Sequence, residues 1–351
     1  MQGAPGELLL AEIREQPEAL NRLLDREADI AAVAQAMVER KPSVVRLVGH
    51  GTSDNAASYG VYAFGLLPAW TALRDSISLT VYYNAQIDLS DSVVIALSQS
   101  GRTPDVVEYV TRAQDRGALT IALTNEPDSE LGRAASAVVP LEAGPERSVA
   151  ATKTYMNQLA ALALLAGGAA GRGAELADGL RRTAELLAES LDPLERTVPA
   201  LAASFAFVGR MFVIGRGLEY ATAREIALKL TETCRVAAEP LTATDLAHGP
   251  VAALDPLFPV WTIASADESL GAVVDAAARA REAGATLLAS GSAAHLVVGA
   301  SYALPVPEAP SPLLAPLLSV LPGQLFAWAL AQAKGLDPDK PHGLTKVTLA
   351  R

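Results

Sequence analysis

A tandem repeat constrains the fold of this 351-residue chain more than any other feature. The turn Gly49-His50-Gly51 returns as Gly215-Arg216-Gly217 at an offset of 166, and nearly the same offset brings Ala96-Leu97-Ser98 onto Ile263-Ala264-Ser265. Similarity over such a distance indicates two like domains in tandem, and the length suits two cores. The alternative is two unrelated strands that each end in a Gly-x-Gly turn.

Apolar runs of strand length alternate with helix-like segments, which predicts parallel sheets flanked by helices. Strands are predicted at 44–49, 79–83, 92–97, 118–123 and 137–141, and helices at 152–167, 174–190 and 192–205. The pattern restarts with strands at 211–215, 260–265 and 285–289 and helices at 220–235 and 269–283. We therefore expect an α/β fold with two doubly wound parallel sheets.

The expected organisation has four segments. They are an N-terminal helical segment (1–40), a first domain with connecting helices (41–190), a second domain (191–334) and a C-terminal tail (335–351).

Composition excludes several classes of protein. A formal net charge of -11 disfavours nucleic-acid binding, which depends on neutralising phosphates. The apolar, uncharged stretch Leu159–Gly171 has 13 residues, too few to span a bilayer, and no signal peptide is visible, so we expect a cytoplasmic protein without a membrane span. The single cysteine, Cys234, excludes an intrachain disulfide and is expected to pack as a small apolar residue.

The segment from Ser98 to Pro104 follows a predicted strand and precedes a predicted helix, with Thr103 suited to the N-cap and Pro104 to the first helical position. Backbone N–H groups and the positive end of the helix dipole collect at such a turn, and hydroxyls around a glycine would complete a phosphate cradle. An ordinary capped connection is the alternative. The turn from Gly49 to Asp54 would add donors at the neighbouring strand end.

Nucleotide cofactors are disfavoured. Asp54 stands where a dinucleotide fingerprint needs its third glycine, and no GxxxxGK[ST] loop occurs. None of the four histidines forms HxxxH or HExxH, so no metal site is expected.

Candidate acid–base groups lie in the second half. Glu225, Lys229 and Glu232 share one stripe of the predicted helix 220–235, either as a solvated ion-pair stripe or as a base held beside a substrate. His248 lies in a turn closed by Gly-Pro, either as an acid–base group or as a plain loop residue. Lys346, near the C-terminus, is either an exposed tail lysine or an amine able to form a Schiff base.

Together these motifs resemble the sugar isomerase (SIS) family, specifically the isomerase half of the glucosamine-fructose-6-phosphate aminotransferases. The resemblance runs nearly end to end through eight motifs in order. They are Glu12-Ile13-x-Glu15-Gln16-Pro17, Gly51-Thr52-Ser53, Ser98-Gln99-Ser100-Gly101-x-Thr103, Val149-Ala150-x-Thr152-Lys153, Gly215-Arg216-Gly217, Ala227-Leu228-Lys229-Leu230-x-Glu232, His248-Gly249-Pro250 and Lys346.

The resemblance implies a role for each matching residue. Glu232 would move a proton between C1 and C2 of a hexose, with Lys229 beside it, His248 would open the sugar ring from a partner subunit, and Lys346 would form a Schiff base with a ketose. A homodimer with shared sites and no cofactor is implied. Hydroxyl and amide groups would hold the 6-phosphate, and three further positions would contact the substrate: Ser53, Ser98, Gln99, Ser100 and Thr103 for the phosphate, and Gly51, Thr52 and Val149 for the substrate.

The sequence also departs from the aminotransferases. The isomerase-like region begins by residue 11, which leaves no room for a glutaminase domain, so we expect the reaction to run toward nitrogen release. Arg102, Ala151, Asp245 and His342-Gly343 replace an acid, a serine, a glutamate and Arg-Asn, so the sugar itself is open.

The expected reaction is conversion of glucosamine 6-phosphate to fructose 6-phosphate and ammonia. Fructosamine 6-phosphate deglycase and galactosamine 6-phosphate deaminase or isomerase activities are alternatives. A phosphosugar sensor without catalysis is an alternative of another class, although the joint presence of Lys229, Glu232, His248 and Lys346 favours an enzyme.

Overall fold

The computed structural model describes residues 4–346 and divides them into two compact units, each built around one repeat. The first-repeat unit comprises residues 18–146, 153–181 and 345–346. The second-repeat unit comprises residues 4–17, 147–152 and 182–344. Each unit therefore takes up three separate stretches of the chain, and those stretches alternate along the sequence.

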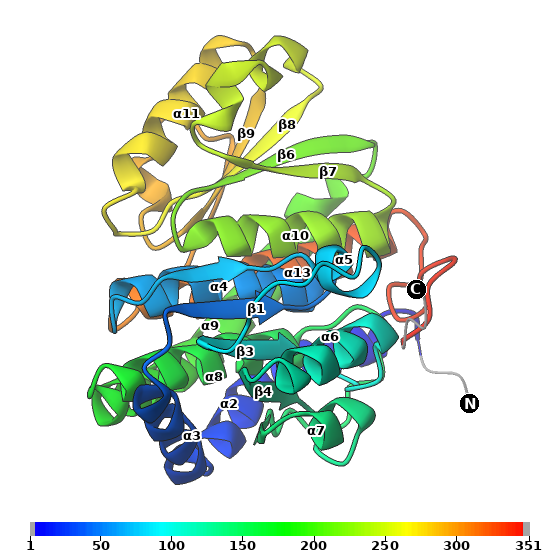
Figure 1. Ribbon diagram of the computed structural model, residues 1–351. Coiled ribbons are helices and arrows are strands. Elements are labelled where there is room, and N and C mark those ends of the chain that lie inside the picture. The colour runs from blue at the N-terminus through cyan, green and yellow to red at the C-terminus, as the bar shows by residue number, and fades with distance from the viewer. Residues whose placement is uncertain (1–3, 347–351) are drawn as a thin grey trace. The chain divides into compact units, whose positions relative to one another are not determined.

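The first-repeat unit contains a parallel five-stranded sheet in the order β2-β1-β3-β4-β5. Figure 1 labels its strands β1, β3 and β4. The central strand β3 is buried along its whole length, as its unbroken apolar run predicts. The chain reverses its direction of progress across the sheet between β1 and β3, which is where open α/β sheets bind ligands. The strands are β1 (Val44–Val48), β2 (Ala72–Arg74), β3 (Ser92–Leu97), β4 (Leu119–Thr124) and β5 (Ala137–Pro140).

Helices cover the first sheet, and α8 packs against both α3 and α4. Helix α8 is buried from Lys153 to Gly167 because nearly all of its residues are apolar or small. The helices of this unit are α3 (Glu27–Arg40), α4 (Thr52–Leu66), α5 (Ile77–Val81), α6 (Pro104–Asp115), α7 (Glu130–Ala134) and α8 (Lys153–Ala169), and α2 (Gln16–Leu24) begins just before it.

The strand predicted at 79–83 is wrong, because this segment holds helix α5 and the edge strand is β2. The cause lies at Asp75, which ends the extended segment after β2. Its carboxylate accepts hydrogen bonds from Arg46 Nη1 (2.7 Å), Tyr109 Oη (2.6 Å) and the backbone N–H of Ser76 (2.7 Å). The β-branched residues that follow favour a strand locally, but this anchored turn places them outside the sheet.

The second-repeat unit contains a sheet of the same design, in the order β10-β9-β8-β6-β7 with all strands parallel. Taken from β7, this order matches that of the first sheet, so β6 and β8 flank the equivalent crevice. The prediction of an α/β fold with two doubly wound parallel sheets is confirmed. The strands are β6 (Arg210–Gly215), β7 (Ala237–Thr242), β8 (Pro259–Ile263), β9 (Thr286–Gly291) and β10 (Tyr302–Pro305).

Helix α10 lies along β6 and β7 in Figure 1 and also packs against α12 and α13. At the N-terminal end of the chain, α1 packs against α13. The helices of this unit are α1 (Glu7–Arg14), α10 (Glu219–Cys234), α11 (Leu270–Glu282), α12 (Ala315–Ser319) and α13 (Leu321–Ala333), with 3₁₀ turns η1 (Asp245–His248), η2 (Pro250–Ala253), η3 (Ala294–Leu296) and η4 (Pro312–Leu314).

The two helices predicted at 174–190 and 192–205 are wrong as separate elements, because α9 (Gly173–Ala203) runs through both. Pro193 lies inside this helix although proline removes a backbone hydrogen bond. Leu187, Leu194, Val198 and Leu201 continue one buried stripe across it. The strands that were not predicted, β2, β7 and β10, are all at sheet edges, where short or proline-containing segments give a weak signal.

The stretch Pro312–Ala333 is long and apolar enough to cross a membrane, with mean hydropathy 1.7, but 94% of its most apolar part is buried in the structure. A segment buried to this extent is typical of a helix in the protein core. Cys234 packs as expected: it is buried, its Sγ donates to the carbonyl of Ala327 (3.1 Å), and burial raises its pKa to about 11, so it stays a thiol.

Candidate active site

The residues of the predicted cradle lie at the carboxyl end of β3, in the first-repeat unit. Thr103 is the N-cap of α6 and Pro104 occupies the first turn, as predicted. Ser98 Oγ lies 3.1 Å from Thr103 Oγ1 and accepts the backbone N–H of Gly101 at 3.2 Å. Ser100 Oγ accepts the backbone N–H of Arg102 at 3.3 Å. The loop therefore gathers three hydroxyls at the start of a helix.

Gly101 is required by this geometry. Its φ is +61°, and an added Cβ would lie 1.9 Å from Ser129 Oγ. Gln99 and Ser100 are half-buried, whereas the Arg102 side chain is exposed.

The turn after β1 lies beside the cradle. An added Cβ at Gly49 would lie 3.1 Å from the carbonyl oxygen of Leu97, so the ends of β1 and β3 are in close contact. Gly51 (φ +54°) precedes α4, whose first residues are Thr52 and Ser53. Ser53 is buried and its Oγ accepts a hydrogen bond from Gln158 Nε2 on α8 at 2.9 Å. Because this hydroxyl accepts from Gln158, its own proton remains available to an anion.

A histidine that the sequence singled out only as part of this turn is paired. His50 Nε2 lies 2.8 Å from Asp105 Oδ2, while Asp105 Oδ1 is buried without a hydrogen-bond partner among residues 4–346. The Asp105 side chain is 9% exposed and the His50 ring 54% exposed. The pairing fixes which ring nitrogen of His50 faces outward.

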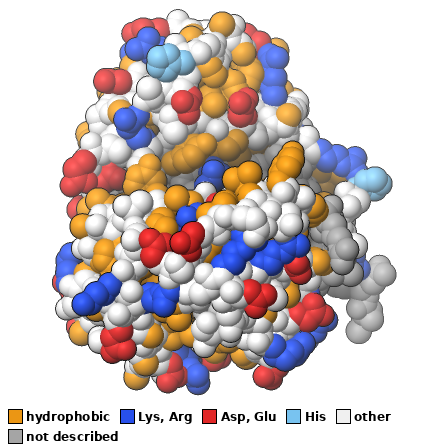
Figure 2. Space-filling view, in the orientation of Figure 1, with side chains coloured by type: hydrophobic (Ala, Val, Ile, Leu, Met, Phe, Trp, Pro, Cys, Tyr) orange, Lys and Arg blue, Asp and Glu red, His pale blue; other side chains and the backbone are white. Residues whose placement is uncertain are grey.

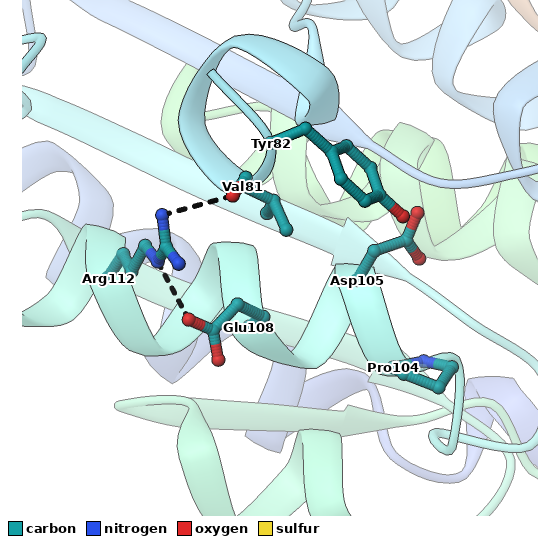
Figure 3. Close-up of a pocket in the computed structure, with 6 residues that line it drawn as sticks. All are labelled: Val81, Tyr82, Pro104, Asp105, Glu108 and Arg112. Atoms are coloured by element: carbon teal, nitrogen blue, oxygen red, sulfur yellow. Dashed lines mark hydrogen bonds and ion pairs between the residues drawn. The ribbon is translucent and has the colours of Figure 1, made fainter. Parts of the chain in front are cut away.

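Asp105 also lines a pocket of about 370 Å³ between α5 and α6 (Figure 3). Arg112 lines one side of this pocket and donates hydrogen bonds to Glu108 Oε1 (2.7 Å) and to the carbonyl of Thr80 (2.6 Å). Its charge is therefore neutralised locally. The lining residues are Val81, Tyr82, Pro104, Asp105, Glu108 and Arg112.

The charged stripe on α10 is buried, which contradicts the solvated alternative. Lys229 Nζ lies 2.6 Å from Glu232 Oε2 and 3.4 Å from Glu225 Oε1. The side chains of Lys229 and Glu225 are 2% and 0% exposed, whereas that of Glu232 is 23% exposed. A buried ammonium thus holds a carboxylate that still reaches the surface, as a base acting on a bound substrate requires.

His248 ends η1 and is exposed, and Gly249 follows it with φ +138°. Its side chain projects into solvent, which fits either reading of the sequence. Val149 is half-buried and donates its backbone N–H to the carbonyl of Asp339 at 3.3 Å. Within residues 4–346, no hydrogen bond joins His248 or Val149 to another predicted site residue.

Lys346 is not an exposed tail lysine. Its Nζ lies 2.8 Å from Glu146 Oε2, and the two side chains are 21% and 0% exposed. Glu146 Oε1 accepts the backbone N–H of Thr154 at 3.1 Å, so the carboxylate is fixed by the start of α8. Sequence reasoning missed Glu146, and its only signal is its place three residues before the Val149 motif.

The model of the SIS domain matches residues 40–167 and 204–333, one match for each repeat. The chain belongs to the SIS-domain family. Two tandem SIS domains, as the motifs predicted, are therefore confirmed.

Proteins related to these SIS domains align with most of this chain. A glutamine–fructose-6-phosphate aminotransferase (isomerizing) of Aeropyrum pernix is 34% identical over 96% of this chain, which spans 56% of that protein. The chain thus spans about half the length of the curated relatives it matches. A Silicibacter pomeroyi protein, provisionally assigned as a phosphosugar isomerase, is 33% identical with a TM-score of 0.81, over 94% of this chain and 99% of its own. The C-terminal domain of the Francisella tularensis glucosamine-fructose-6-phosphate aminotransferase is 26% identical with a TM-score of 0.88, over 95% and 98%.

Proposed function

We propose that this SIS protein isomerises a phosphosugar between its aldose and ketose forms, with Glu232 as the proton-transferring base. The observation that carries the proposal is the buried Lys229 ammonium 2.6 Å from the Glu232 carboxylate. Burying a charged group costs free energy, and a protein that only binds sugar does not need a buried charge. Held by Lys229, Glu232 can take the proton from C2 and return it to C1.

The cradle supports a phosphorylated substrate. Its hydroxyls and helix N-terminus would bind the phosphate without a basic surface, which suits a chain with a net charge of -11. On the face in Figure 2, basic side chains are interspersed with acidic ones. We propose that Ser53, Ser98, Gln99, Ser100 and Thr103 hold the phosphate, with Gly51, Thr52 and Val149 contacting the sugar.

The finer proposal is that the substrate is glucosamine 6-phosphate and the products are fructose 6-phosphate and ammonia. Proton transfer from C2 to C1 turns the 2-amino aldose into a ketose imine. Lys346 can attack that imine carbon, releasing ammonia, and water then hydrolyses the resulting Schiff base. Glu146, at 2.8 Å, is placed to accept the proton that Lys346 must lose first. Release is the favoured direction because ammonium has no lone pair with which to attack a carbonyl.

The test is to incubate the full chain with glucosamine 6-phosphate and follow ammonia and fructose 6-phosphate. Formation of both in equal amounts is the expected result. Fructosamine 6-phosphate and galactosamine 6-phosphate, run in parallel, distinguish the deglycase and galactosamine alternatives. Binding without turnover across this panel would show that the protein is a phosphosugar sensor and not an enzyme.

We also propose that the protein acts in the cytoplasm, without a cofactor or a nucleic-acid or membrane partner, as a homodimer in which His248 of one subunit opens the sugar ring bound to the other. The exposure of His248, at the end of η1, supports a reach beyond its own subunit.

A further inference from the structure

The second SIS domain has its own crevice, between the ends of β6 and β8. The offset of 166 that relates the two glycine turns also places Glu219 opposite Ser53 and Gln324 opposite Gln158. An offset of 167 places Ser265 opposite Ser98. Gly217 has φ +60°, close to the +54° of Gly51, so the two turns have like conformations. The second domain therefore repeats the backbone of the cradle with a different set of side chains.

A carboxyl group fills this second crevice. Glu219 is 2% exposed. Its Oε1 accepts a hydrogen bond from Ser265 Oγ at 2.5 Å, and its Oε2 accepts one from Thr222 Oγ1 at 2.6 Å. Ser265 Oγ lies 3.2 Å from Ser319 Oγ on α12, which adds a third hydroxyl. The hydroxyls that would meet an anion are thus already engaged by a group of this chain.

The two glutamines reveal the difference between the domains. In the first, Gln158 Nε2 bonds the Ser53 hydroxyl. In the second, Gln324 is 1% exposed, and neither its Nε2 nor its Oε1 has a hydrogen-bond partner within residues 4–346. A buried amide without hydrogen bonds costs free energy. The Gln324 side chain therefore indicates that a hydrogen-bonding partner is missing at this place in the second domain. A serine at position 219 would be the equivalent of the partner that Gln158 has.

We propose that Glu219 plugs a second anion cradle, so that each chain binds a single phosphosugar, and that Glu219→Ser opens this cradle to phosphate. The donors are a helix N-terminus of a 16-residue helix and the hydroxyls of Thr222, Ser265 and Ser319. An anion cannot compete with a carboxyl group that is covalently attached and already desolvated. The proposal does not require catalysis, only that the first cradle binds phosphate.

The test uses the full chain with its first cradle disabled by Ser98→Ala and Thr103→Val. Into this background we introduce Glu219→Ser and, as a matched control, Glu239→Ser at an exposed position of β7. Inorganic phosphate is titrated at constant ionic strength while Tm and ³¹P line widths are followed. Phosphate should raise Tm progressively and broaden the ³¹P signal only in the Glu219→Ser variant.

The proposal would be overturned if the Glu219→Ser protein unfolds cooperatively but its Tm rises with phosphate no more than that of the Glu239→Ser control. Stoichiometry provides a second measurement that does not depend on the folding of that variant. Calorimetry with a phosphosugar should give one site per chain for the parent protein, and the Ser98→Ala, Thr103→Val background should keep no site of parent affinity. Two sites per chain in the parent, or a site of parent affinity in that background, would show that the second cradle is open despite Glu219. Loss of turnover in the glucosamine 6-phosphate assay leaves both measurements intact, so the two proposals fail separately.

Discussion

Lys346 Nζ lies 2.8 Å from the fully buried carboxylate of Glu146, 200 residues earlier in the chain. The ammonium is thereby held in place while its charge is balanced. A lysine that forms a Schiff base must first give up a proton, and a fixed carboxylate within hydrogen-bond distance is suited to receive it.

Glu146→Gln should therefore reduce turnover by about 10²-fold or more while phosphosugar binding persists. Borohydride trapping followed by mass spectrometry measures the Schiff base directly, and the trapped adduct should fall in Glu146→Gln and vanish in Lys346→Arg. Glu130→Gln, at an exposed position, is the control. Undiminished trapping in Lys346→Arg would show that another amine reacts.

Glu232→Gln should abolish turnover and leave phosphosugar affinity nearly unchanged, because proton transfer needs a base and phosphate binding does not. Isothermal titration and the ammonia assay on the same preparation separate the two effects. Equal loss of binding and turnover would show that Glu232 has a binding role instead.

Lys229→Met should destabilise the protein by about 3–5 kcal/mol, because it removes the ammonium that two carboxylates of α10 contact at a buried position. Urea denaturation gives the free energy of unfolding. Lys340→Met, at an exposed position, should change it by less than about 0.5 kcal/mol. A small effect of Lys229→Met would mean that the stripe is hydrated in solution.

Ser98→Ala and Thr103→Val should raise KM for the phosphosugar with little change in kcat, since the cradle binds the ground state and the transition state alike. The preference for phosphorylated over unphosphorylated sugar should shrink in parallel. Arg102→Ala, with an exposed side chain, is the control. A fall in kcat alone would place these hydroxyls at the reacting carbons.

The pH dependence of stability should report on Glu219. Burial raises the pKa of its carboxyl, although hydrogen bonds from Ser265, Thr222 and Ser319 oppose the shift. A raised pKa in the folded state means that stability is full below the ordinary pKa of glutamate and declines as pH rises toward the raised value. Glu219→Gln should flatten that decline in denaturation curves taken from pH 4 to pH 7. A steeper decline in the variant would show that the pKa of Glu219 is lowered and not raised.

Mixing two inactive variants tests the shared site. Co-refolded Glu232→Gln and His248→Asn chains should recover about a quarter of the parent activity, because half of the dimers are mixed and each has one complete site. If His248 acts within its own subunit, no activity returns.

Much of the fold followed from local patterns. The repeated glycine turns, the buried strand β3 and the Thr103-Pro104 helix start each depend on residues close in sequence, and each was predicted. Helix α5 was not, because its β-branched residues favour a strand and only the distant contacts of Asp75 with Arg46 and Tyr109 exclude one.

The site was predictable in its residues but not in its burial. Periodicity placed Lys229 and Glu232 on one face of a helix, but it does not say whether that face meets solvent or protein. The Glu146–Lys346 and His50–Asp105 pairs join segments that only the fold brings together, so no spacing in the sequence predicts them.

The interleaving of the two units bears on how the protein is made. The carboxylate of Asp339 accepts the backbone N–H groups of Leu8 (3.1 Å) and Leu9 (2.7 Å), at a separation of 331 and 330 residues. During synthesis α1 must therefore wait until Asp339 has left the ribosome. The first-repeat sheet, complete by residue 140, can form long before that, so the nascent chain should carry a folded first sheet together with an α1 that lacks its Asp339 partner until residue 339 has emerged.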